Sequence, residues 1–208
     1  CSDPTMEQKS GTLSSLKQDY ETCFHPNDSV YARIAHRLGD FYRINGDFEN
    51  GIRFANEAVS INKQPLPGAQ RSYLAHTYYN LALYHNLLGL TEDAHLYYDS
   101  CLEVGYQFQE KIFIALMALE KKAFLYFQTG DYEQSIRLAN QGIALSREQS
   151  LPDYEALLLI QRAQAQAELN RIDEGEADVT QAIQILNKNE LVNYLPNAYS
   201  VLPNVLSR

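Results

Sequence analysis

Apolar side chains recur along this chain at spacings of three and four residues, which is the period of an amphipathic α-helix. Ile34, Leu38 and Phe41 follow this spacing, and so do Leu119 and Ala123. The sequence carries no strand signal. The pattern therefore predicts helices near residues 12–24, 29–45, 48–63, 70–88, 92–105, 108–129, 132–148, 153–169, 173–188 and 191–206.

Four stretches of the chain resemble one another. Each has Gly or Asn at a corresponding point, at Gly46, Gly89, Gly130 and Asn170, which lie 43, 41 and 40 residues apart. A near-constant period of this length indicates a helical repeat rather than a generic helical bundle. Three further positions in every stretch hold a small residue, as expected where two helix backbones cross closely: Gly39, Ala82, Ala123 and Ala163; Gly51, Ala94, Ser135 and Gly175; Ala58, Cys101, Gly142 and Ala182.

The Gly or Asn positions predict the turn inside each repeat. Glycine, and asparagine as second choice, adopts the left-handed conformation that ends a helix. Asp47 and Asp131 follow two of these turns and are suited to cap the next helix, because an Asp side chain accepts from its free amide groups. Each repeat is therefore expected to be two helices joined by a tight turn, over residues 29–64, 70–106, 108–148 and 153–188.

This order of small, aromatic, Gly-Asp-aromatic, small and apolar residues resembles the tetratricopeptide repeat. The resemblance covers roughly residues 29–188, although the usual period is 34 residues and these repeats are longer by ~6–9. Leu90 replaces the Asp of the second repeat, and His85 and Gln166 stand where an aromatic is usual. The matching residues are Leu38, Gly39, Tyr42, Gly46-Asp47-Phe48, Ile52, Ala58 and Ile61 in the first repeat, and Ala123, Tyr126, Gly130-Asp131-Tyr132, Ile136, Gly142 and Leu145 in the third.

The resemblance implies an all-α fold, a right-handed superhelical α-solenoid of about four helix-turn-helix repeats. We expect the solenoid to occupy residues 12–208, with terminal helices 12–24 and 191–206, after a flexible tether at 1–11. Longer repeats of this kind are similar to those of bacterial signalling and regulator proteins.

In this family the first helix of each repeat lines a concave groove that usually binds a peptide or a protein surface. The alternative for the groove aromatics is packing against neighbouring helices. A clamp for a terminal carboxylate, as in chaperone-binding members, is not expected, because His36, Asp40 and Met117 depart from its pattern. Carried over to this sequence, the groove positions are Arg33, His36, Arg37, Asp40, Arg43, His76, Tyr79, Asn80, Leu83, Asn86, Glu120, Lys121, Phe124, Phe127, Gln128, Ile160, Gln161, Gln164 and Glu168.

Composition and charge exclude other classes of protein. The formal net charge is −9 and the 17 Lys and Arg residues are scattered, so nucleic acid is not an expected partner. The longest apolar run, Ile112 to Leu119, is far shorter than the ~20 residues of a membrane span, so we expect a soluble chain.

The three cysteines, Cys1, Cys23 and Cys101, match no disulfide or metal framework. A chain that begins with Cys followed by Ser2 and Asp3 resembles a mature bacterial lipoprotein, in which Cys1 carries the lipid. The alternative is that Cys1 is simply where this segment starts. The first alternative predicts a periplasmic or membrane-anchored lipoprotein, and the second predicts a cytoplasmic protein.

We find no constellation of catalytic residues, so the sequence predicts neither an enzyme nor a cofactor. The five histidines lack the spacing of a helical metal site, and no metal is expected. Cys101 occupies a small packing position and is expected to be an inert buried thiol. The acidic run from Asp173 to Asp178 is best explained as the start of a helix, where carboxylates complement the helix dipole.

The sequence therefore favours a protein-binding or peptide-binding scaffold that is a segment of a bacterial signalling protein or lipoprotein. The alternative is the ligand-sensing or peptide-sensing domain of a transcriptional regulator whose output domain lies elsewhere. A homodimer is left open. Since residues 191–206 lack a polar outer face, we also expect the natural chain to continue beyond Arg208.

Overall fold

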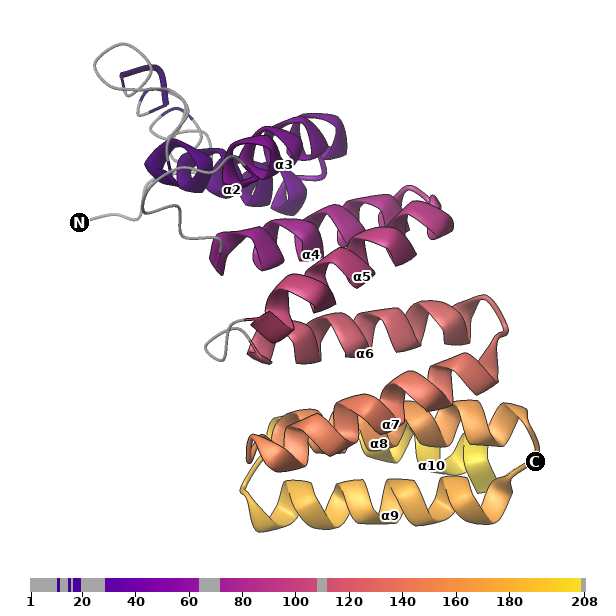
Figure 1. The fold of residues 1–208 in the computed structure, drawn as a ribbon. Coiled ribbons are helices and arrows are strands. Elements are labelled where there is room, and N and C mark those ends of the chain that lie inside the picture. The colour runs from indigo at the N-terminus through magenta and orange to yellow at the C-terminus, as the bar shows by residue number, and fades with distance from the viewer. Residues whose placement is uncertain are drawn as a thin grey trace. The chain divides into compact units, whose positions relative to one another are not determined.

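The computed structural model describes residues 11, 15, 17–19, 29–63, 72–107 and 112–206. Every regular element among them is helical, which confirms the predicted all-α fold, and the helix bounds lie within about four residues of those expected. The tether, Cys1 and most of the helix predicted at 12–24 lie outside the described residues. The elements, shown in Figure 1, are α2 (Ser29–Ile44), α3 (Phe48–Asn62), α4 (Ser72–Leu87), α5 (Thr91–Gln107), α6 (Ile112–Gln128), α7 (Tyr132–Glu148), α8 (Pro152–Glu168), α9 (Ile172–Lys188), the 3₁₀ helix η2 (Val192–Tyr194) and α10 (Leu195–Leu206).

The chain divides into two compact units, Cys1–Ala115 and Leu116–Arg208. The first unit contains the helix pairs α2–α3 and α4–α5, and the second contains most of α6 together with α7 to α10. No helix in the described ranges combines the length and the apolar character needed to cross a membrane.

The tight turns lie where the repeat pattern predicts them. Gly46, Gly89 and Gly130 have φ angles of 76°, 74° and 84°, and Asn170 has 60°. At the first turn, the amide groups of Gly46 and Asp47 donate to the last carbonyls of α2, at 3.1 and 3.0 Å. Those carbonyls have no partner inside their own helix, so the left-handed residue satisfies them.

The two predicted aspartate caps are present. Asp47 accepts a hydrogen bond from the backbone N–H of Asn50, and Asp131 accepts one from Gln134, both at 3.2 Å. Each carboxylate thereby satisfies one of the free amide groups in the first turn of its helix.

Every small residue of the repeat pattern is buried. The closest fit surrounds Tyr84 of α4. A methyl group added to Gly51 of α3 would lie 2.6 Å from the Tyr84 ring, and the Tyr84 hydroxyl donates to the Gly39 carbonyl of α2 at 2.5 Å. The missing side chains therefore let α2, α3 and α4 approach one another.

At each later junction, a glycine likewise lies against a side chain of the next helix, with no room for a methyl group of its own. A methyl group on Gly105 of α5 would lie 3.1 Å from Ala115 of α6. On Gly142 of α7 it would lie 2.6 Å from Leu158 of α8. On Gly175 of α9 it would lie 3.1 Å from Val205 of α10.

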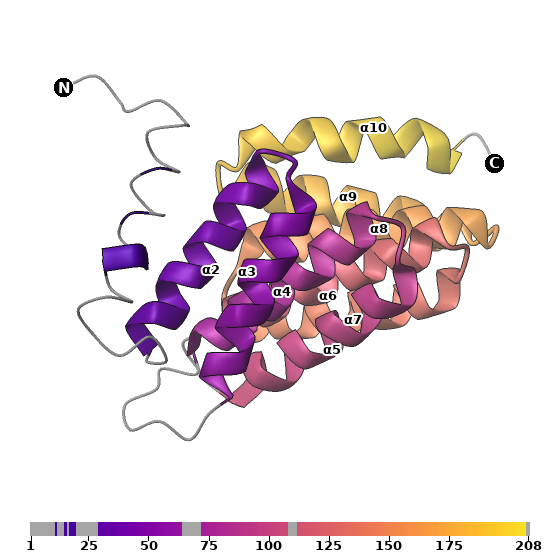
Figure 2. The same ribbon diagram turned by 90° about the horizontal axis from the view of Figure 1, so that it is seen from above.

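The second unit has one continuous apolar core, to which α8 contributes Leu158, Leu159 and Ala163. Helix α10 packs on this core through Val201 and Val205. Figure 2 shows α10 lying alongside α9 and α8. Helix α10 thus occupies the position of the first helix of a further repeat.

Two turns between helix pairs were not predicted. Ser150, before α8, and Glu190, before η2, have φ angles of 56° and 58°. Their backbones close the preceding helices as the glycines do elsewhere, with the Leu151 N–H donating to Ser146 O and the Leu191 N–H to Leu186 O, both at 2.9 Å.

Candidate functional site

The second unit carries a groove between α6, α8 and α10. Two cavities of about 260 and 230 Å³ form it, and both are lined by Gln164 and Val201, so they adjoin. We call this the second-unit groove. Its lining residues are Glu120, Phe124 and Phe127 of α6, Leu157, Ile160, Gln161, Gln164, Ala167 and Glu168 of α8, and Asn197, Ser200, Val201, Asn204 and Val205 of α10.

Helical periodicity places these side chains. In α8, Gln161, Gln164 and Glu168 follow one another at spacings of three and four and face the groove. Leu159 lies on the opposite side of the helix and is fully buried in the core. The apolar stripe of α8 therefore fixes which polar stripe is presented to a partner.

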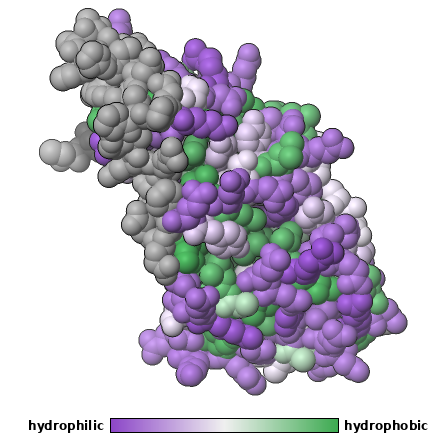
Figure 3. All heavy atoms as spheres, viewed as in Figure 1, coloured by the Kyte–Doolittle hydropathy of each residue, from purple (hydrophilic) through white to green (hydrophobic). Residues whose placement is uncertain are grey.

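An aromatic pair forms the α6 wall of the groove. The rings of Phe124 and Phe127 stack with centroids 6.3 Å apart and an angle of 18° between their planes. Phe124 keeps 39% of its surface exposed. On the face drawn in Figure 3, hydrophobic side chains are interleaved with hydrophilic ones. The pair is accessible apolar area of the kind that anchors a protein partner.

Gln161 contributes a hydrogen-bond acceptor to the groove. Its side-chain Nε2 donates to the backbone carbonyl of Glu120 at 3.2 Å, which orients the amide. Its Oε1 has no hydrogen-bond partner among the described residues, although the residue is only 5% exposed. Leaving such a buried acceptor without a hydrogen bond costs ~1–3 kcal/mol. A hydrogen-bond donor from a binding partner would therefore be favoured here.

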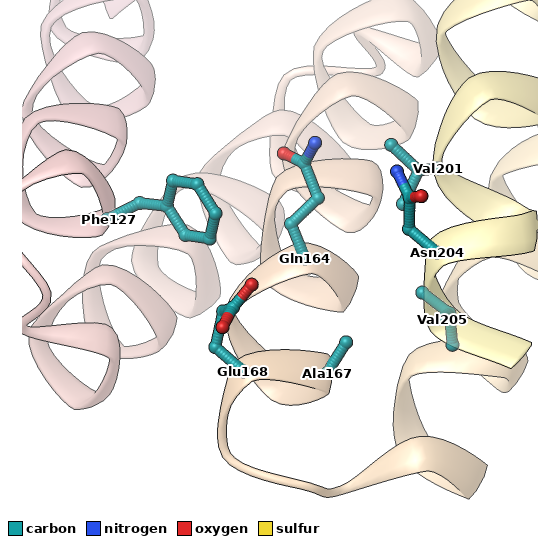
Figure 4. A pocket seen from close by; sticks show the side chains of 7 residues that line it. All are labelled: Phe127, Gln164, Ala167, Glu168, Val201, Asn204 and Val205. Atoms are coloured by element: carbon teal, nitrogen blue, oxygen red, sulfur yellow. The ribbon is translucent and has the colours of Figure 1, made fainter. Parts of the chain in front are cut away.

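The charges that line the groove are negative. Glu120 and Glu168 line its two cavities, and no Lys or Arg is among the described residues that line them. The nearby ammonium of Lys121 lies 3.0 Å from the Glu120 carboxylate. Figure 4 shows the Glu168 carboxylate beside the Phe127 ring, with the amides of Gln164 and Asn204 between α8 and α10.

The groove residues predicted in the first unit lie in different surroundings. Arg33 and Arg37 are exposed on α2. The Asp40 carboxylate accepts from the Arg43 guanidinium at 2.9 Å, and Leu83 is half-buried.

Tyr79 and Asn80 differ from the prediction, because both are 8% exposed. The Tyr79 ring meets Tyr98 of α5 edge-on with the ring centroids 6.3 Å apart. For Tyr79, packing against the neighbouring helix replaces the expected open surface. Gln161 is also buried, at 5% exposed, and it lines a cavity of the second-unit groove.

Sequence reasoning missed the α10 wall, which contributes Asn197, Ser200, Val201 and Asn204. Continuing the repeat one unit past Lys188 would have placed a groove-lining helix there. Pro196 and Pro203 obscured that signal, although the first lies in the opening turn of α10 and the second is accommodated within the helix.

No reactive group stands out among the described residues. Burial raises the pKa of the Cys101 thiol to about 12, so this side chain stays protonated and is a poor nucleophile. The described part of the chain contains no cluster of three or more His, Cys, Asp or Glu side chains that could hold a metal ion. Of the acidic run, Asp173 and Glu174 lie in the first turn of α9, as predicted.

Comparison with known proteins identifies the repeat. The tetratricopeptide repeat family model matches residues 30–106. No curated protein sequence matches the chain.

Solved structures share the fold at low sequence identity. The apo form of RapI is 13% identical with a TM-score of 0.75, over 85% of this chain and 63% of RapI. BtubC from P. vanneervenii is 13% identical with a TM-score of 0.74, over 99% of this chain and 88% of BtubC. Aspartyl phosphate phosphatase F from Bacillus subtilis is 13% identical with a TM-score of 0.69, over 84% of this chain and 46% of the phosphatase.

Proposed function

The chain has the fold of tetratricopeptide repeat proteins, with residues 30–106 matching the family itself, and from this premise we propose that it is a scaffold that binds a protein segment in the second-unit groove. Members of this family generally act as non-catalytic binding scaffolds. The proposed binding surface is the second-unit groove, because its lining combines exposed aromatic side chains with a hydrogen-bond acceptor.

The buried Gln161 acceptor beside the stacked phenylalanines carries this proposal. Phe124 and Phe127 offer apolar area, and Gln161 Oε1 offers a directional hydrogen bond. An extended peptide presents both complements, since its side chains can cover aromatic rings while its backbone N–H groups donate. Both cavities are smaller than the ~300–1,000 Å³ of typical small-molecule sites, which suits the insertion of individual side chains.

The test is retention of peptides from an immobilised array by the whole chain. The double variant Phe124→Ala, Phe127→Ala removes the aromatic wall, and we expect its retention of groove ligands to fall at least about tenfold, the effect of losing ~1.4 kcal/mol. Leu96→Ala is the matched control, because Leu96 is an apolar side chain of α5 that is 64% exposed. Equal retention by the double variant and the wild type would refute the groove as the binding surface.

We further propose that the scaffold belongs to a bacterial signalling protein or a lipoprotein. Its likeness to a chain named aspartyl phosphate phosphatase F is in keeping with a signalling context. The lipoprotein form of the proposal depends on Cys1, which lies outside the described residues. Mass spectrometry of the protein from its native membrane fraction would detect a lipid on Cys1, and an unmodified thiol would count against this form.

The alternative function is the sensing domain of a regulator, in which a bound peptide changes the activity of another domain. This chain spans only 63% of RapI and 46% of phosphatase F, whereas it spans 88% of BtubC. Activity of the full-length gene product, measured with and without a groove-binding peptide, separates a sensor from a scaffold.

A further inference from the structure

We infer that α10 is a self-association surface, on which a second copy of this chain packs its own α10 in the antiparallel direction. The inference goes beyond the proposed function and does not depend on it. The surface is the outer side of α10, which lies opposite the side that lines the second-unit groove through Asn197, Ser200 and Asn204.

An apolar stripe runs along the outer side of α10 at spacings of four, three and four residues. Its members are Leu195, Tyr199, Leu202 and Leu206. Tyr199 is 53% exposed and Leu206 is 54% exposed, while the other two are half-buried at the edge of the second-unit core. This is the spacing with which two helices pack side by side along a common seam. A contiguous exposed apolar surface of this kind indicates an interaction site.

The earlier repeats show that this stripe is normally covered. Val205 of α10 faces Gly175, and Tyr84 of α4 faces the equivalent Gly51. Counting back from these two contacts, the position of Tyr199 in α10 corresponds to one buried residue in every earlier first helix. The residues at that position in α2, α4, α6 and α8 are Ala35, Tyr78, Leu119 and Leu159, which are 0%, 7%, 0% and 0% exposed.

The second helix of a pair supplies this cover. Tyr78 stacks with Tyr97 of α5, with the ring centroids 6.3 Å apart. At the position equivalent to Leu206, Tyr42 stacks on Phe54 of α3 with the ring centroids 5.5 Å apart. Among the described residues of the second unit, no helix follows α10 to cover it in this way. The stripe therefore fits an antiparallel helix that brings apolar side chains of its own.

The α10 helix of a second copy meets this requirement. A two-fold axis across the stripe sets the two helices antiparallel and presents the same side chains from both. The spacings of four, three and four read the same in both directions. Leu195 of one copy can therefore meet Leu206 of the other, while Tyr199 meets Leu202.

Charge favours the same occupant. Residues 191–206 contain no Asp, Glu, Lys or Arg, in a chain whose formal net charge is −9. Two acidic copies can therefore meet on this stripe without placing like charges opposite each other. A partner selected by charge would find no ionic group to pair with here.

The test is sedimentation velocity of the full-length gene product over a series of concentrations. We expect a reversible dimer with a dissociation constant on the order of 10 μM. The double variant Tyr199→Glu, Leu206→Glu should raise this constant about a hundredfold or more, because four apolar side chains leave the interface and carboxylates replace them. Both positions are exposed in the single chain, so circular dichroism and urea unfolding should show the variant folded.

Two control variants accompany this measurement. Leu87→Glu, Leu96→Glu makes the same change in charge at apolar positions of the first unit that are 59% and 64% exposed, and it should keep the dimer. Tyr199→Phe keeps the apolar area and should change the dissociation constant less than about threefold.

Three outcomes would overturn the inference. A wild type that stays monomeric up to about 0.1 mM would do so, and it is the result expected if a helix from elsewhere in the full-length chain or from another protein covers the stripe. A dimer that the glutamate double variant retains would place the interface elsewhere. Growth beyond the dimer with rising concentration would indicate a head-to-tail contact in place of the two-fold one.

Discussion

Gly51 is a residue whose missing side chain has a defined use. The space beside its Cα is filled by the ring of Tyr84, and the Tyr84 hydroxyl continues to the carbonyl of Gly39. The contact joins three helices of the first unit through one buried side chain. The stability of this three-helix contact therefore depends on Gly39 and Gly51, neither of which carries a side chain.

Gly51→Ala should destabilise the first unit by ~1–3 kcal/mol, the usual cost of overpacking a rigid core. The new methyl group would lie 2.6 Å from a Tyr84 ring carbon, and the ring has little room to move because Tyr84 is fully buried. The free energy of unfolding in urea, followed by circular dichroism, measures the effect.

Ser60→Ala on the exposed face of the same helix is the matched control for this prediction. It should change the free energy of unfolding by less than about 0.5 kcal/mol, as surface substitutions usually do. Equal stability of the Gly51 variant and this control would show that Tyr84 does not need the space.

His36 is a buried residue of the first unit whose pKa departs from its ordinary value. It is 9% exposed, and its Nδ1 lies 3.1 Å from the Thr77 hydroxyl. That hydroxyl donates to the Tyr73 carbonyl, so it accepts from Nδ1. Burial, aided by His76, lowers the pKa of His36 from 6.5 to about 4, Asp40 opposes the change and Arg37 adds to it.

The lowered pKa of His36 predicts that stability falls as the pH is lowered. Well above pH 6.5 the His36 imidazole is neutral in both the folded and the unfolded chain, so its titration does not reduce the free energy of unfolding. Between 6.5 and about 4 the unfolded chain binds a proton that the folded chain does not. The cost reaches ~2–3 kcal/mol at the acid end of this window.

The free energy of unfolding, measured by urea titration at successive pH values, tests this for the wild type and His36→Gln. The variant cannot titrate, so its curve should be flatter between pH 6.5 and 4. Parallel curves for the two proteins would contradict the assignment to His36, because the carboxylates that titrate in the same range are common to both.

At the scale of elements, the turns divide into two kinds. The turns inside the helix pairs use Gly46, Gly89, Gly130 and Asn170, residues suited to a positive φ. The turns before α8 and before η2 use Ser150 and Glu190, which are not. The φ angles of the two kinds of turn are similar. Ser150 and Glu190 therefore adopt a positive φ because of the helices that they connect, although neither residue type favours it.

Glu190→Gly should therefore raise the free energy of unfolding by ~0.5–1 kcal/mol, since a left-handed residue with a side chain costs ~1–2 kcal/mol and part of the gain is lost to the more flexible unfolded chain. Gly130→Ala is the reciprocal test and should lower it by about 1 kcal/mol. Thermal and urea unfolding measure both. A decrease in Glu190→Gly would show that the glutamate side chain makes a compensating contact.

The same division explains what the sequence could predict about the elements. Helices and their internal turns follow from local signals: the three-four apolar spacing, glycine at the turn, and the caps Asp47 and Asp131. The turns at Ser150 and Glu190 carry no such signal, because those residues are common in helices and loops alike. Their conformation is imposed by the helices that they connect.

The candidate site was predictable only where one helix determines a residue's surroundings. Helical phase alone places Phe124, Phe127 and Gln164 on the groove face. The burial of Tyr79 depends on Tyr98, a residue of another helix, and the α10 wall depends on how residues beyond the last recognisable repeat pack. Contacts of this kind have no local sequence signature.

At the scale of the molecule, Arg162 connects three helices of the second unit. From α8 it donates to both oxygens of Asp178 in α9, at 2.7 and 2.6 Å, and to the side-chain oxygen of Asn140 in α7. The Asp178 side chain is 8% exposed. Removing the arginine would leave a buried carboxylate without its counterion.

Arg162→Ala should cost ~2–3 kcal/mol, below the ~3–5 kcal/mol of a fully buried pair because the arginine side chain is partly exposed. In repeat proteins each unit is stabilised by its neighbours in sequence. We therefore expect faster hydrogen exchange mainly in α7, α8 and α9, measured by mass spectrometry, and little change in α2 and α3.

Arg43→Ala is the matched control in the first unit, where the ion pair of Arg43 with Asp40 is more exposed and spans one turn of a single helix. Its cost should be less than about 1 kcal/mol. A uniform loss of protection across both units in Arg162→Ala would contradict the idea that the damage stays local.

The glycines at the contacts between successive helix pairs also limit how the repeats of such a chain can be duplicated or exchanged. Gly51 faces a tyrosine, Gly105 an alanine, Gly142 a leucine and Gly175 a valine, so each junction is matched to a partner of different size. A duplicated or transplanted pair would bring its glycine against the wrong side chain, leaving a void or a clash. Engineers who wish to shuffle these repeats should move each glycine together with its partner in the next helix, cutting the chain inside a pair rather than between pairs.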